Sequence, residues 1–138
     1  MTSEPQTGAP PLSKSLDQLE GRLKPVRIAA TPIERRCEKL RALPLGDLAP
    51  GDLAVLIGQR IGLDAVVPRA IELLEAAPLT SGGDYPGDLL GTVLRLDRDF
   101  WRNRLRLHAR VAAIADVLAS VPEEIAAELD EFPRTMSA

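Results

Sequence analysis

Apolar residues spaced by three and four positions run through most of this chain and constrain its fold class. Between residues 53 and 129, leucine, isoleucine and valine recur at the spacing that places them on one face of an α-helix. No alternating pattern typical of a β-strand extends beyond a few residues. Because aromatic residues make up only 3% of the chain, aliphatic side chains must form the core. We therefore predict an all-α, compact single-domain bundle of about five to six helices with a flexible N-terminal tail.

Prolines and capping residues mark the ends of the first predicted helices. Thr31 can cap a helix whose first turn contains Pro32, and Pro44 cannot continue that helix. Pro50 suits the first turn of the next helix, which Gly62 ends or bends. These signals predict two short helices in this part of the chain.

The next apolar stretch contains a proline, which leaves two interpretations open. Either the helix kinks at Pro68 or its regular part starts near Val66. Residues 78–83 are rich in loop formers, and Asp84 or Tyr85 can then cap a new helix.

The two ends of the chain differ in how clearly they are patterned. A long helix is predicted from about Arg98 to Ser120, followed by a short helix that starts at Pro122. We expect residues 1–14 to form a disordered tail and residues 15–138 to form the helical domain. Three leucines near the start of that domain could form either a short docked turn or a strand: Leu16, Leu19 and Leu23.

The residue types that most catalytic sites need are scarce here. Nucleophilic catalysis needs a Ser or Cys beside a base, which is usually His. The chain has one histidine, His108, interpreted as satisfied or surface-exposed, and one cysteine, Cys37, interpreted as a buried thiol. No Cys or His pair has metal-ligand spacing, and no glycine-rich stretch follows a strand. We expect no catalytic residue, metal, cofactor or small-molecule substrate.

Composition also indicates which cellular compartment and which kinds of partner to expect. A single cysteine favours a reducing compartment, and the N-terminus lacks the charged start and apolar run of a signal peptide. No apolar run approaches the ~20 residues that cross a bilayer. The net charge of −3 counts against a nucleic-acid partner. We therefore expect a cytoplasmic protein that does not enter a membrane.

Six residues are predicted to contact a protein partner. Three belong to the string GGDYPGDLL, which places a tyrosine and two acids at a loop and helix start, although capping alone would also explain them. The lone tryptophan is a second aromatic anchor, although such a residue more often packs on the core. Two glutamates represent an acidic C-terminal segment that could face a basic partner. The six are Asp84, Tyr85, Asp88, Trp101, Glu124 and Glu128.

Two further hypotheses stay open at this point. Four arginines recur at every fourth position, so one helix face could serve a nucleic-acid-associated regulator, or could simply be a solvated surface. A small enzyme with a carboxylate or metal site is the third hypothesis, although no pair of carboxylates stands out. The four arginines are Arg98, Arg102, Arg106 and Arg110.

Three motifs in a fixed order resemble those of one known family. They are Arg-Arg-Cys-x-x-Leu at residues 35–40, Leu-Ile-Gly-Gln-x-Ile-Gly-Leu at residues 56–63, and Tyr-Pro-Gly-Asp-Leu-Leu at residues 85–90. Together with SKSLDQLEG at residues 13–21, they resemble immunity proteins of contact-dependent growth inhibition (CDI) systems. The resemblance extends from residue 13 to about residue 95.

The resemblance implies a cytoplasmic antitoxin without catalytic residues. Such a protein binds the cognate C-terminal toxin domain, often a nuclease, and blocks its active site or an essential surface. A stable one-to-one complex of this kind would bury about 1,200–2,000 Å² of surface in total. Because toxin-contacting residues differ between cognate pairs, no contact residue follows from the resemblance.

Overall fold

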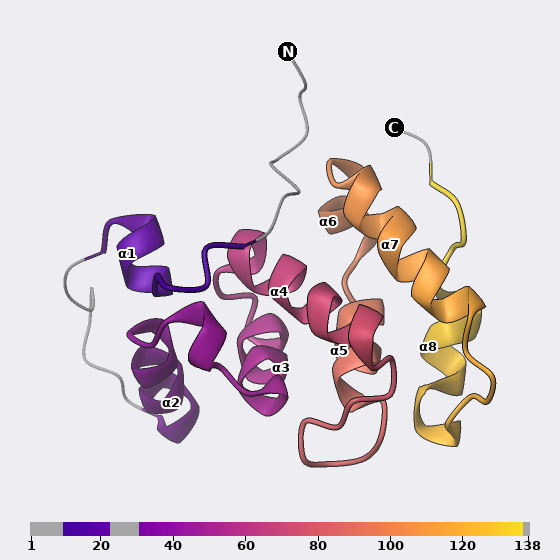
Figure 1. Cartoon of the computed structure of the whole chain (residues 1–138), viewed down its shortest axis with the longest axis horizontal. Coiled ribbons are helices and arrows are strands. Elements are labelled where there is room, and N and C mark those ends of the chain that lie inside the picture. The colour runs from indigo at the N-terminus through magenta and orange to yellow at the C-terminus, as the bar shows by residue number, and fades with distance from the viewer. Residues whose placement is uncertain (1–9, 23–30, 137–138) are drawn as a thin grey trace.

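The computed structural model describes residues 10–22 and 31–136, and these residues form helices and loops without a β-strand (Figure 1). The all-α prediction is confirmed. The described residues contain eight α-helices and two short 3-10 helices, more than the predicted five to six. In chain order they are α1 (Leu16–Glu20), α2 (Pro32–Arg41), η1 (Leu45–Asp47), α3 (Pro50–Gly58), α4 (Leu63–Ala76), α5 (Asp88–Leu94), α6 (Arg98–Arg102), α7 (Leu105–Asp116), η2 (Glu123–Ile125) and α8 (Ala126–Glu131).

The first leucines form a helical turn and not a strand. Leu16 in α1 is buried, whereas Leu19 is exposed and Leu23 lies outside the described residues. Of the predicted tail, residues 1–9 also lie outside them. The carbonyls of Leu12 and Lys14 accept hydrogen bonds from the amides of Gly46 and Leu45 in η1, so the described part of the tail lies along that turn.

Helices α2 and α3 begin where the sequence predicted. The Thr31 hydroxyl accepts a hydrogen bond from the Glu34 amide at 3.1 Å, as expected for the cap of α2. Helix α3 begins at Pro50, and the Asp52 carboxylate accepts from the amide of Ala49 at 2.9 Å.

Pro68 lies inside α4 and not at its start. The helix begins at Leu63, directly after Gly62, whose φ of 61° is in the left-handed region that favours glycine. The interpretation that the regular part starts near Val66 is therefore wrong. Helical backbone continues through Pro68, although proline has no N–H to donate to the Asp64 carbonyl one turn earlier.

Helix α5 starts later than predicted. Its first residue is Asp88, preceded by Gly87 with φ of 89°, so Asp84 and Tyr85 lie in the loop and do not cap the helix. The Asp88 carboxylate accepts hydrogen bonds from backbone amides of this loop, which keeps the loop out of the helix.

The long helix predicted from Arg98 to Ser120 is wrong. It is divided into α6 and α7 at Arg104, whose backbone is not helical (φ −135°, ψ 51°). The Arg104 guanidinium lies 4.3 Å from the centre of the Phe100 ring and donates to the Phe100 carbonyl at 2.9 Å. This side chain satisfies a carbonyl at the end of α6 and so stabilises the break.

One hydrophobic core joins the described helices. Helices α3, α4 and α5 pack against one another, α7 packs on α4, and α8 packs on α5. The pair α1 and α2 lies at one end of the molecule, and α6, α7 and α8 lie at the other (Figure 1). No helix among residues 10–22 and 31–136 is long and apolar enough to cross a membrane.

Candidate partner-binding face

Two pockets adjoin on either side of Arg95, which lines both. The loop pocket, about 270 Å³, lies between α3, α5 and the 78–87 loop. The C-terminal pocket, about 400 Å³, lies between the end of α5, the start of α6 and α8 with the residues after it. We call this two-pocket surface the Arg95 face.

Arg95 is held between two helices at the centre of this face. Its Nη1 lies 3.5 Å from Oε1 of Glu128 on α8, and its Nη2 donates to the Thr92 hydroxyl of α5 at 3.2 Å. The Arg95 side chain is 52% exposed, so this ion pair is screened by solvent and contributes little stability. Its geometric effect is to separate the two pockets.

The loop pocket owes its shape to a buried carboxylate. Asp88 is only 7% exposed, and its two oxygens accept from the amides of Gly82 at 2.5 Å and Asp84 at 3.0 Å. Gly51 of α3 allows the loop to approach, since a Cβ atom there would lie 2.4 Å from the Gly82 carbonyl oxygen. The loop thereby presents Asp84 as exposed and Tyr85 as half-buried.

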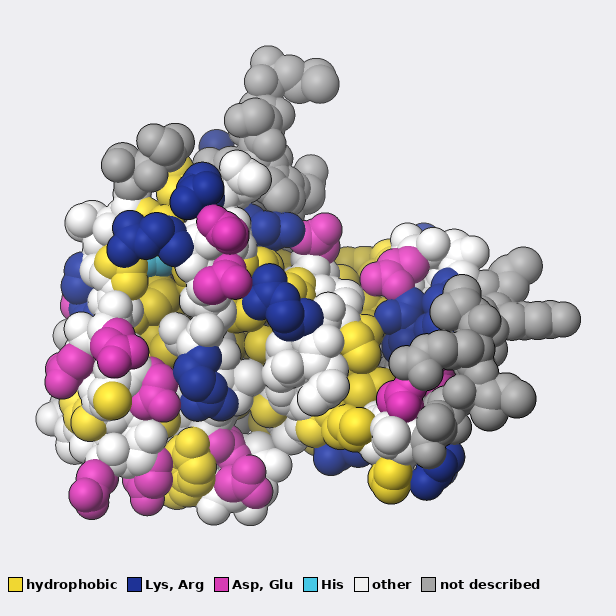
Figure 2. Space-filling model, turned by 180° about the vertical axis from the view of Figure 1, so that it is seen from behind, with side chains coloured by type: hydrophobic (Ala, Val, Ile, Leu, Met, Phe, Trp, Pro, Cys, Tyr) yellow, Lys and Arg dark blue, Asp and Glu magenta, His cyan; other side chains and the backbone are white. Residues whose placement is uncertain are grey.

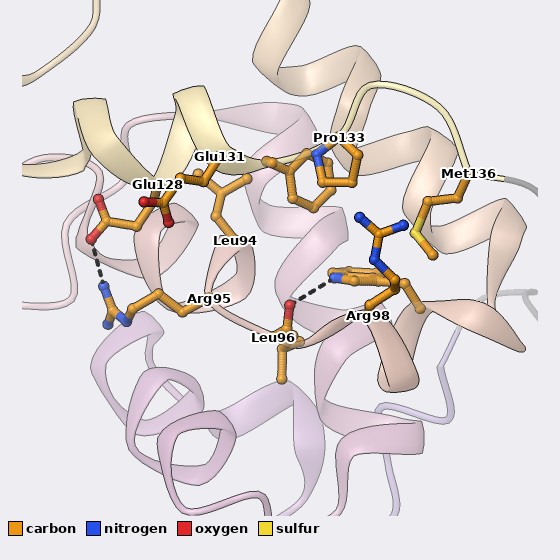
Figure 3. A pocket seen from close by; sticks show the side chains of 10 residues that line it. Leu94, Arg95, Leu96, Arg98, Glu128, Glu131, Pro133 and Met136 are labelled. Carbon is orange, nitrogen blue, oxygen red and sulfur yellow. Dashed lines mark hydrogen bonds and ion pairs between the residues drawn. The ribbon is translucent and has the colours of Figure 1, made fainter.

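The C-terminal pocket has an apolar floor and charged sides (Figure 3). Trp101 is 1% exposed, and its indole N–H donates to the Leu96 carbonyl at 3.1 Å. Figure 3 shows Glu128, Glu131 and Arg95 on one side of the pocket, and on the other side the pair Arg98 and Met136.

A buried histidine supports this floor from beneath. His108 is 2% exposed and stacks on Phe132, with ring centroids 4.7 Å apart and planes 20° apart. The imidazole hydrogen-bonds to the backbone of Pro133, while its Nε2 has no hydrogen-bond partner. Burial lowers the pKa of His108, and the bond to Pro133 opposes that shift. The histidine is therefore buried and only half satisfied, not exposed.

Five of the six predicted contact residues line the Arg95 face. Asp84, Tyr85 and Asp88 line the loop pocket, and Trp101 and Glu128 line the C-terminal pocket. Glu124 is exposed on η2 and lines neither.

The buried members of this set shape the face instead of projecting from it. Asp88 orders the loop and Trp101 forms a pocket floor, so neither side chain projects from the surface toward a partner. Arg95, Arg98 and Glu131 also line this face but were not among the six predicted contact residues. Arg95 and Glu128 are 33 residues apart, and no local pattern signals such a pair.

The arginine ladder does not form one helix face. Arg98 and Arg102 belong to α6, whereas Arg106 and Arg110 belong to α7, beyond the break. Arg110 donates two hydrogen bonds to the Glu75 carboxylate, from Nε at 3.0 Å and from Nη2 at 2.7 Å. The ion pair lowers the pKa of Glu75. The single-face prediction is therefore wrong.

Metal and thiol chemistry find no support among the described residues. They contain no group of three or more His, Cys, Asp or Glu side chains placed to hold a metal ion. Cys37 is 4% exposed, and burial raises the pKa of its thiol, which disfavours the reactive thiolate.

Acidic side chains gather over the end of the molecule that α8 forms (Figure 2). An all-α scaffold with a charged, two-pocket face is a protein suited to binding another protein. The family model of CDI immunity proteins matches residues 18–111, more than half of the chain, and the chain belongs to this family. No curated protein matches it. Membership makes it an immunity protein against a CDI toxin, and that toxin is its protein partner.

Proposed function

We propose that the protein neutralises its toxin by direct one-to-one binding through the Arg95 face, in the cytoplasm, and that the toxin domain is a nuclease. The observation that carries the proposal is the convergence of Asp84, Tyr85 and Glu128 on two adjoining pockets. Pockets that accept side chains, beside a tyrosine, are where binding energy concentrates in protein interfaces.

The charge of the surrounding surface supports a basic partner. Residues 123–131 carry acidic side chains without a Lys or Arg, and the whole chain has a net charge of −3. A nuclease must bind phosphates and so presents basic groups at its active site. An acidic surface would compete for those groups and block the site.

The nucleic-acid alternative has lost its geometric basis. It required one continuous arginine face, but the break at Arg104 divides the ladder between two helices, and Arg102 and Arg110 pair with Asp99 and Glu75. On the part of the surface that the structure describes, the ladder therefore does not form one row of arginines that could follow a phosphate backbone.

Co-expression with the C-terminal toxin domain encoded beside this gene tests the proposal. Cells that contain both proteins should grow, and a one-to-one complex should elute in size-exclusion chromatography. Tyr85→Ala should weaken the complex by roughly 30-fold, since loss of an interface anchor costs about 2 kcal/mol. Equal killing with and without the protein would refute direct neutralisation.

A matched pair of charge variants tests the face itself. Asp84→Asn should weaken binding. Asp47→Asn should not, because Asp47 is also exposed but lies on η1 and lines neither pocket. If the two variants bind the toxin equally well and the complex still forms, the toxin uses another surface.

A further inference from the structure

The C-terminal pocket has a floor that can take only an apolar group. Leu94, Leu96, Trp101 and Phe132 line it, and the one donor among these side chains, the indole N–H of Trp101, is already bonded to the Leu96 carbonyl. A volume of about 400 Å³ is enough for one long side chain. Polar selectivity must therefore come from the rim.

The rim on the α8 side has an excess of negative charge. Glu128 and Glu131 stand three residues apart on α8, so they share a helix face. Arg95 neutralises only Glu128 and also donates to Thr92. No ion pair is found for Glu131 within residues 10–22 and 31–136.

The opposite rim carries a positive charge that has no ion pair with a described residue. Arg98 also lines the pocket without an ion pair to any described residue, and it lies on the side away from Glu131 (Figure 3). A cation beside Glu131 would thus sit at the end far from Arg98. Further acids on the same C-terminal segment, Glu123, Glu124 and Asp130, add to the negative field at that end.

The pocket is closed by the part of the chain that the family model does not cover. Leu94 to Trp101 lie within residues 18–111, whereas Glu128, Glu131, Phe132 and Met136 lie beyond them. Half of the residues that line the pocket therefore lie outside the segment that the family model matches. A toxin contact placed here would distinguish its own toxin from those of other family members.

We propose that the C-terminal pocket is a specificity anchor that accepts one Arg or Lys side chain of the toxin. The aliphatic stem lies along Trp101 and Phe132, and the cationic group pairs with Glu131 and shares Glu128 with Arg95. This inference rests on the proposed function, and it adds the chemistry of the side chain that the pocket recognises.

A direct binding experiment tests the pocket without the toxin. Trp101 is the chain's only tryptophan, so its fluorescence and indole N–H resonance report on the pocket alone. Millimolar Nα-acetyl-arginine methylamide should shift both signals of the full-length protein. The matched acid, Nα-acetyl-glutamate methylamide, should not; a response to the acid, or to neither compound, would overturn the proposal.

Three variants locate the charge that matters, with toxin affinity as the second measurement. Glu131→Gln should weaken binding of the arginine derivative and of the toxin about 10-fold. Glu123→Gln, on the same acidic segment but outside the pocket, should weaken the derivative's binding far less than Glu131→Gln, because Glu123 acts only through the screened long-range field. Arg98→Gln should leave the derivative's binding unchanged or strengthen it, whereas weakening by Arg98→Gln alone would mean an acidic occupant and refute the inference.

The toxin measurements separate failure of the anchor from failure of the proposed function. If wild-type protein does not bind the toxin, direct neutralisation fails, while the arginine derivative still decides what the pocket accepts. If wild-type and Glu131→Gln proteins bind the toxin equally, the function stands and the anchor is refuted. Equal melting temperatures for the two proteins serve as the folding control.

Discussion

His108 combines burial with an unsatisfied ring nitrogen, and this makes folding sensitive to pH. Its pKa is lowered in the folded state, mainly because burial disfavours the charged imidazolium. The unfolded chain therefore binds the proton more readily below the ordinary histidine value of about 6.5. The contribution of neutral His108 to the free energy of unfolding is therefore complete above about pH 6.5, and it is lost as the pH falls toward the lower pKa of the folded state.

We predict that the urea concentration at the unfolding midpoint decreases as the pH is lowered from about 7 to about 5.5. In this window histidine is the side chain that ordinarily titrates. His108→Phe keeps a ring against Phe132 and removes the titrating group, so its midpoint should change much less over the same window. Because the chain has one histidine, the comparison is clean. Parallel pH profiles for the two proteins would show that another group is responsible.

At the scale of elements, the 78–87 loop depends on its approach to α3. A methyl group at Gly51 would lie 2.4 Å from the Gly82 carbonyl oxygen, which is backbone and has little freedom to move. We predict that Gly51→Ala costs about 1–3 kcal/mol of unfolding free energy, typical of overpacking, and loosens Asp84 and Tyr85. Chemical denaturation and amide hydrogen exchange of the loop would measure the two effects.

Gly58 provides the matched control on the same helix. A Cβ atom at Gly58 would meet nothing within 4 Å, and its φ is not in the left-handed region. Gly58→Ala should therefore stabilise the protein by up to about 1 kcal/mol, because alanine loses less backbone entropy on folding. If both alanine variants are stabilised, α3 does not hold the loop at Gly51.

Sequence patterns predicted the elements whose signals are local. Thr31 and Pro50 predicted where α2 and α3 begin, and the apolar spacing predicted which helix faces are buried. The elements that were misplaced depend on contacts between side chain and backbone. Asp88 lies at the helix start, as expected, but its carboxylate also holds the preceding loop, so neither Asp84 nor Tyr85 caps α5. Arg104 ends α6 by donating to the Phe100 carbonyl.

At the scale of the molecule, the candidate site is assembled from distant parts of the chain. Its polar residues were partly predictable because Tyr85 and the acidic segment are local features. The pockets were not, since Arg95 meets Glu128 only when α8 packs on α5. The sequence left open whether Trp101 packs on the core or projects as a partner anchor, and in the structure Trp101 is buried.

The distribution of charge over the whole molecule predicts how the toxin complex forms and dissociates. Exposed acids outside the pockets, such as Glu123 and Glu124, act through the long-range field, which salt screens over about 8 Å at physiological ionic strength. Charges outside the direct contact change the association rate, whereas close contacts change the dissociation rate.

The double variant Glu123→Gln, Glu124→Gln should therefore slow association and reduce its salt dependence. Glu131→Gln should mainly speed dissociation, because its partner is in direct contact. Surface plasmon resonance at several salt concentrations separates the two rates, and identical kinetics for both variants would mean that acidic residues act only as a diffuse field.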